Sequence, residues 1–144
     1  MYSAVEIAQF IITFCTNIGA PVSNLQLQKI LYYLQVHFAK NGKRLYEEDI
    51  YAWQYGPVIP EIYYLFSGYG ACKIANRYQT NIEPDVQREI EPIIQRLIQI
   101  SPWNLVEMTH EIGGPWYVAY NDGLGVNSII DFENLVTDSA NIYG

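Results

Sequence analysis

The pattern of hydrophobic and polar positions opens with an amphipathic segment over residues 3–17. Its apolar positions at helical spacing are Ala4, Ile7, Ile11 and Phe14. Ser3 is a suitable N-cap, and Glu6 follows at the distance that a capping box requires. Further apolar residues widen the same face, which is typical of a central, well-buried helix. Gly19 and Pro21 mark its end.

A second amphipathic segment can be capped by Ser23 or Asn24 and stops at Asn41-Gly42, where a glycine suits a left-handed cap. Its apolar positions follow the spacing of one buried face and are Leu27, Ile30, Leu31, Leu34 and Phe38. A more polar stripe accompanies them and consists of Gln26, Lys29, Tyr33, His37 and Lys40. We predict a helix with one buried side and one polar side.

Residues 45–55 change character, because most of the large side chains there are β-prone. We expect a short extended segment or a small hairpin. Gly56-Pro57 and Pro60 then predict a stiff loop, since each proline sets its own φ and restricts its predecessor. Pro60 also suits the first position of a short helix, and an irregular connection should follow over residues 68–81.

The C-terminal half contains four further helical patterns. A long one covers about residues 84–100, and Pro92 inside it predicts a kink or a late start. Ser101-Pro102 and Pro115 are typical of helix starts. Ser128 can cap a last helix, whose apolar positions would be Ile129, Ile130, Phe132 and Leu135.

These elements predict a mainly α fold, a compact single-domain helical bundle of about six helices with a short extended segment or small hairpin near residues 45–55. A length of 144 residues is typical of one domain, expected here over residues 1–144. The composition, 50% hydrophobic and 16% charged, argues against general disorder. Thirteen tyrosines and three tryptophans either fill a helical core or supply a contact surface.

A formal net charge of −7 argues against nucleic acid as a direct partner, because phosphate binding needs a basic surface. An acidic surface suits a basic protein partner, and it also keeps a protein soluble. The apolar N-terminal stretch contains Glu6 and lacks a basic start, so we expect no signal peptide. No apolar run has the length of a membrane span. We therefore expect a cytoplasmic protein with two reduced thiols, Cys15 and Cys72.

The chemistry-bearing residues do not form a recognisable catalytic or metal motif. His110-Glu111 is the only pair suited to acid–base work, but adjacent helical residues point in different directions. A metal site would need Cys15, Cys72, His37 and His110, none of which is paired at ligand spacing. We expect no catalytic residue, metal or cofactor. A small hydrolase or metalloprotein that uses His110 is the less favoured alternative, and we expect His110 to bond loop backbone and help hold Trp116.

Three sequence blocks resemble a known family. The first covers residues 25–35, and the second, over residues 52–63, reads Ala-Trp-x-Tyr-Gly-Pro-Val-x-Pro-x-x-Tyr. The third covers residues 105–110 and is followed by Pro115-Trp116. Their order and spacing resemble the Panacea domain, also described as SocA-like or as a phage-associated protein of the GepA type. The second block is the most specific, because so many uncommon residues seldom coincide at set spacing.

This resemblance implies an antitoxin that neutralises a cognate toxin by direct binding, and it implies no enzyme. The alternative is a proteolytic adaptor that delivers a toxin to a cytoplasmic protease. The family-motif positions, which are also the candidate partner-binding residues, are Lys29, Tyr33, Trp53, Tyr55, Gly56, Pro57, Val58, Pro60, Tyr63, His110, Pro115 and Trp116. A purely structural interpretation is that the loop needs its glycine and prolines, with Trp53, Tyr63 and Trp116 packed together beneath it. The identity of the toxin and the stoichiometry stay open.

Overall fold

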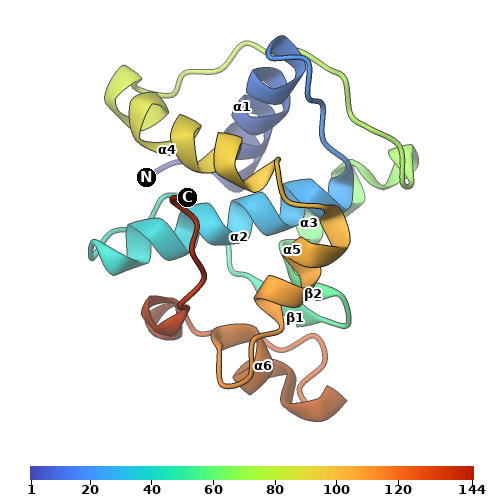
Figure 1. Cartoon of the computed structure of the whole chain (residues 1–144), viewed down its shortest axis with the longest axis vertical. Helices are drawn as coiled ribbons and strands as arrows, with labels where there is room; N and C mark the ends of the chain where they lie inside the picture. Colours follow the sequence, from blue (N-terminus) through green and yellow to red (C-terminus); the bar gives the residue numbers. More distant parts are fainter.

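The computed structural model describes residues 1–144 and confirms a mainly helical fold, organised around one central helix, α2 (Asn24–Lys40) (Figure 1). Only Leu25, His37 and Lys40 of this helix are not buried. α2 contacts α1, α3, α4, α5, β2 and the 3₁₀-helix η3. The more polar stripe of α2 is therefore not a solvent-facing side. Gln26, Lys29 and Tyr33 are covered by neighbouring segments, and the stripe reaches the surface only at His37 and Lys40.

The N-terminal caps follow the sequence closely. α1 (Ala4–Asn17) begins at Ser3, and Ser3 and Glu6 form the predicted capping box. Ser23 is the N-cap of α2 and makes a second capping box with Gln26. In each case the serine hydroxyl accepts from the backbone N–H three residues on, which satisfies a donor that the helix itself leaves free.

A small antiparallel hairpin follows, made of β1 (Tyr51–Trp53) and β2 (Gly56–Val58). The predicted hairpin is confirmed, and β2 occupies the place of the predicted loop at Gly56-Pro57. Pro60 opens α3 (Pro60–Leu65) as expected, and the 3₁₀-helix η1 (Ser67–Tyr69) follows it.

The C-terminal half contains α4 (Pro84–Leu97), α5 (Pro102–Thr109) and α6 (Pro115–Tyr120). α5 has Ser101 as its N-cap, as predicted. The late start predicted for α4 is wrong, since the helix runs from Pro84 through Pro92. The two 3₁₀-helices of this half are η2 (Asn121–Gly123) and η3 (Phe132–Thr137).

The last predicted α-helix is wrong, because residues 127–130 pair with the hairpin instead. The N–H of Ile130 donates to the carbonyl of Ile50, and Tyr51 and Ile129 form an antiparallel bridge. Ser128 is not an N-cap, since its hydroxyl donates to the carbonyl of Ala119. Backbone groups engaged in these pairs are not available for a helical ladder.

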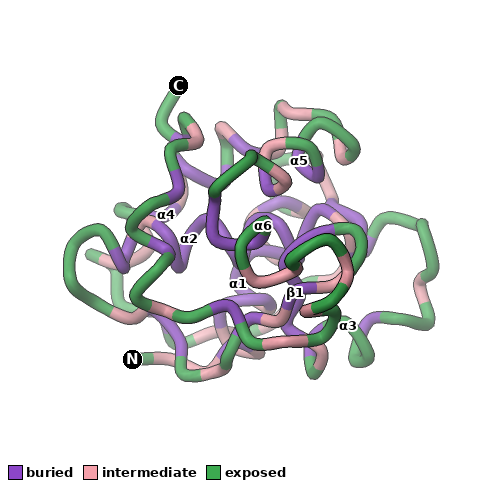
Figure 2. Tube along the Cα trace, turned by 90° about the horizontal axis from the view of Figure 1, so that it is seen from below, coloured by how far each residue is buried: buried purple, intermediate pink, exposed green.

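The interior is one cluster of 35 buried apolar residues. Figure 2 shows the buried stretches at the centre, around α1, α2 and β1, with the exposed loops outside them. The C-terminal segment closes the cluster, because the Tyr32 hydroxyl donates to the buried Asp138 at 2.7 Å. None of the helices combines the length and the apolar character that crossing a membrane requires.

Pro92 generates a stability prediction, because it lies inside α4 and is exposed. Replacing it by alanine restores an N–H donor for the helical ladder and removes no buried contact. We expect Pro92→Ala to raise the free energy of unfolding in urea by about 1–3 kcal/mol. Pro84→Ala is the matched control at the first helical position, where proline is tolerated, and it should change stability far less. A loss of stability in Pro92→Ala would contradict this account of α4.

Candidate partner-binding site

Large aromatic side chains from three separate elements form two ring groups that border the same cavity. We call this set the aromatic surface, and its members are Trp53, Tyr55, Tyr63, Tyr64 and Trp103. Tyr55, Tyr64 and Trp103 are 54%, 65% and 60% exposed. The Trp53 and Tyr63 rings meet edge-to-face with their centroids 5.1 Å apart, and Tyr55 and Trp103 do so at 5.7 Å. Exposed aromatic groups of this kind are unusual on a surface that contacts only water.

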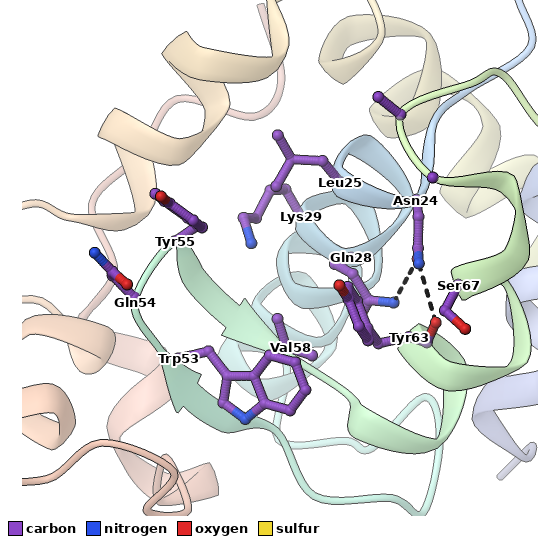
Figure 3. A pocket seen from close by; sticks show the side chains of 12 residues that line it. Asn24, Leu25, Gln28, Lys29, Trp53, Gln54, Tyr55, Val58, Tyr63 and Ser67 are labelled. Carbon is purple, nitrogen blue, oxygen red and sulfur yellow. Dashed lines mark hydrogen bonds between the residues drawn. The ribbon is translucent and has the colours of Figure 1, made fainter.

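A cavity of about 480 Å³ lies within this surface, between the hairpin, α3 and the first turns of α2 (Figure 3). Its lining residues are Asn24, Leu25, Gln28, Lys29, Trp53, Gln54, Tyr55, Val58, Tyr63, Ser67, Gly70 and Ala71. The volume lies within the range typical of small-ligand pockets. The cavity therefore has room for a large side chain of a partner or for a small molecule.

Buried amides of α2 hold the walls of this cavity. Gln28 accepts from the backbone N–H of Ile59 at 2.9 Å and donates to the side chain of Asn24 at 3.0 Å. Asn24 in turn donates to the backbone carbonyl of Tyr63 at 3.0 Å. Because these amides are buried and satisfied, they fix α3 and the end of the hairpin relative to α2.

Gly56 allows β2 to approach α5 closely. Its φ is +113°, and a Cβ atom placed there would lie 2.7 Å from Oγ1 of Thr109 and 3.0 Å from Cε of Lys29. Any other residue would meet both the steric conflict and the unfavourable backbone conformation. The glycine of the family-like block is therefore required by the packing of the hairpin.

Lys29 is fully buried beneath β2, and its Nζ donates to the carbonyl of Pro57 at 3.2 Å. Figure 3 shows it projecting from α2 toward the strand, between Tyr55 and Val58. The close acid–base pairs of the chain, His37–Glu89 and Arg88–Asp85, do not include it. Burial penalises the ammonium form and lowers the pKa of Lys29 to about 7.

His110 and Trp116 form a second cluster beside the hairpin. Their rings stack with centroids 3.7 Å apart, and Trp116 stacks in turn on Tyr120. The indole N–H of Trp116 donates to the carbonyl of Trp53 at 2.8 Å, which ties α6 to β1. Burial lowers the pKa of His110, with the charge of Lys29 as a second cause. The prediction that His110 helps to hold Trp116 is confirmed by the stacking of the two rings. The prediction that His110 bonds loop backbone is wrong, because its Nε2 has no hydrogen-bond partner.

Comparisons with known proteins show the family of the chain. A family model described as Antitoxin SocA-like, Panacea domain, matches residues 27–117. A protein of Caulobacter vibrioides named Antitoxin SocA is 32% identical in an alignment of 135 positions, which covers 84% of this chain and 71% of that protein. The chain belongs to the SocA-like Panacea family. No solved structure matches it.

The structure brings together five of the twelve candidate site residues of this Panacea domain. Lys29, Trp53, Tyr55, Val58 and Tyr63 line the cavity. The other candidates lie outside its lining. Gly56 and Pro57 form β2 behind the cavity, Pro60 begins α3, Tyr33 is fully buried, and His110, Pro115 and Trp116 belong to the second cluster.

The packing revises the expectation for one residue of the Panacea motif, Trp116, and adds two residues to the candidate surface. Trp53 and Tyr63 pack together as the structural interpretation proposed, but the ring of Trp116 packs on His110 and Tyr120 instead. The aromatic surface adds two residues that the sequence did not single out, Tyr64 and Trp103. Trp103 is the second residue of α5, directly after Pro102. The sequence around it has no pattern that tells whether its side chain is exposed or buried.

Gly56→Ala should destabilise the Panacea domain by about 2–4 kcal/mol in urea unfolding, because it combines a positive φ with the conflict at Thr109. Gly42→Ala is the matched control, since its φ is +71° and its Cβ would meet nothing within 4 Å. That variant should lose only the conformational part, about 1–2 kcal/mol. Equal losses in the two variants would contradict the close approach of β2 to α5.

The lowered pKa of the buried Lys29 predicts that the stability of the protein depends on pH. The folded chain releases the Lys29 proton near pH 7, whereas an unfolded chain holds it to about pH 10.4. Between these values the unfolded state binds more protons, so the free energy of unfolding rises with pH. Relative to Lys29→Met, the wild type should gain up to about 1.4 kcal/mol per pH unit between pH 7 and 9. If the difference in the free energy of unfolding between the wild type and Lys29→Met did not change with pH, Lys29 would not be desolvated in the folded state.

Proposed function

We propose that this protein is an antitoxin that neutralises a cognate toxin by direct protein–protein binding, with the aromatic surface as the contact. Membership of the SocA-like Panacea family and the relative named Antitoxin SocA support the antitoxin role. The toxin would be encoded beside this protein and would meet it in the cytoplasm.

The observation that carries the choice of surface is the exposure of Tyr55, Tyr64 and Trp103 together on one face. Tyrosine and tryptophan are enriched at the energetic centres of protein interfaces, where they bury a large apolar area and keep a polar tip for hydrogen bonding. The rigid support from α2 keeps these side chains in place before binding, which reduces the conformational entropy lost on association.

The charge of the chain favours a basic partner. The formal net charge is −7, from 15 acidic and 8 basic residues. Such a charge accelerates encounter with a positively charged protein and opposes nonspecific association with nucleic acid. A basic toxin that acts on nucleic acid would therefore be a suitable partner for this antitoxin.

Binding is favoured over catalysis by the surroundings of the residues best suited to chemistry. The ring of His110 is stacked against Trp116, and no nucleophile is hydrogen-bonded to it. Cys72 is exposed, and Cys15 is buried in the core, where desolvation raises the pKa of its thiol to about 12. The structure contains no group of three or more His, Cys, Asp or Glu side chains that could hold a metal ion.

A proteolytic adaptor is the second candidate, because an adaptor needs two separate contact surfaces. A second set of exposed apolar side chains surrounds α6 and the loop after it and consists of Ile112, Tyr117, Val118, Leu124 and Val126. The half-life of the toxin in cells with and without this protein separates the two candidates, since simple neutralisation leaves that half-life unchanged.

Alanine substitutions on the aromatic surface test the proposed contact. Tyr64→Ala and Trp103→Ala remove exposed rings and should leave the core intact. Each should weaken the complex with the product of the neighbouring open reading frame by about tenfold or more, and together they should abolish growth rescue on co-expression. Affinity is measured by calorimetry on purified proteins.

Tyr143→Ala is the matched control, because Tyr143 is 60% exposed and contacts His37, near the opposite end of α2 from the cavity. It should retain rescue and affinity. The proposed contact is wrong if Tyr143→Ala is impaired as strongly as the other variants, or if the double variant still binds fully. A neighbouring product that is harmless alone, or that forms no complex, would sink the antitoxin role itself.

A further inference from the structure

The cavity within the aromatic surface differs in charge from the rest of the chain. The chain has almost twice as many acidic as basic residues, 15 against 8. Nevertheless, the cavity lining contains no aspartate or glutamate, and Lys29 is its only charged residue. Below its pKa of about 7, the buried Lys29 therefore places a positive charge behind the cavity wall of an acidic protein.

The hydrogen bonding of Lys29 leaves this charge largely uncompensated. An ammonium group has three donors, and the structure provides one acceptor, the carbonyl of Pro57. A buried ammonium without an anion nearby is unfavourable, so an anion bound at the cavity wall would be stabilised there.

The remaining walls select for an apolar group. Leu25, Val58 and the rings of Trp53 and Tyr63 supply apolar surface. The polar side chains Gln28 and Asn24 are already bonded to the hairpin, to α3 and to each other. In these bonds each amide uses one N–H and one lone pair of its oxygen, so Lys29 remains the only charged group of the lining.

We propose that this cavity binds an acidic residue next to a large apolar side chain on the toxin, with the apolar group between Trp53 and Tyr63 and the carboxylate at the wall formed by Lys29. The inference rests on the proposed function, since it names the chemistry of the toxin segment that the aromatic surface receives. Lys29 is shielded from water, so it acts on the carboxylate through the low-dielectric interior, where attraction is stronger than in solvent.

A locally acidic segment is compatible with a basic toxin. The overall charges of the two proteins influence the rate of encounter. At physiological salt, exposed charges further apart than about 8 Å are largely screened, so they have little effect on a group inside the cavity. The group inside the cavity is governed by its nearest charge, which is that of Lys29. The net charges of the two proteins therefore matter for encounter, whereas the charge of Lys29 matters for the group inside the cavity.

The test uses small peptide probes and needs no toxin. Acetyl-Phe-Glu-amide and the neutral acetyl-Phe-Gln-amide are titrated into the ¹⁵N-labelled full chain at pH 6.5, and the Trp53 indole and Gln28 amide signals are followed by NMR. The glutamate probe should bind about tenfold more tightly, which corresponds to a rise of about one unit in the pKa of Lys29 on binding. Lys29→Met should remove this preference and retain the apolar part of the binding.

Equal affinity of the two probes for the wild type would overturn the inference, and so would the absence of signal changes at Trp53 and Gln28. This comparison needs no variant, so it decides the matter even if Lys29→Met does not fold. Acetate is the third arm, and binding as tight as that of the glutamate probe would show a simple anion site and contradict the apolar requirement. Failure of toxin rescue with a positive probe result would instead remove the antitoxin role and leave the binding site.

Discussion

The near-complete enclosure of α2 is the constraint on which the rest of the structure depends. A helix covered on nearly all sides needs hydrogen-bond partners inside the protein for its buried polar side chains, and those of α2 find them except for the hydroxyl of Tyr33. Gln35 bonds the backbone of Leu45 and Tyr46, and Gln28 bonds that of Ile59. These contacts connect α2 to segments that lie far away in the sequence, so the helix both fills the core and positions the surrounding chain.

The aromatic surface follows from this constraint. The hairpin has only three residues in each strand and could not be stable alone. It is held from below by α2 and from the side by the indole of Trp116, which bonds the carbonyl of Trp53. With the interior already filled, Tyr55 and Tyr64 remain outside on a rigid support. A surface of this kind is prepared for a partner before the partner arrives.

The sequence predicts those parts of the fold that depend on local chemistry. The capping pair at Ser3, the proline-led helix starts and the hairpin position are all readable because neighbouring residues determine them. The burial of Lys29 and Tyr33 was not readable, since it depends on which distant segments cover α2. The helix predicted after Ser128 failed for the same reason, because Ile50 takes the backbone N–H of Ile130. The exposure of Tyr64 and Trp103 is likewise a result of packing.

The central claim is that the face formed by the hairpin, α3 and the start of α5 binds the toxin. Amide hydrogen exchange of the complex with the neighbouring gene product, compared with the free protein, tests it most directly. The account predicts slower exchange in residues 53–67 and around Trp103, with little change near His37 and Tyr143 at the far end of α2. Protection confined to that far end, or to α6 and its loop, would contradict it.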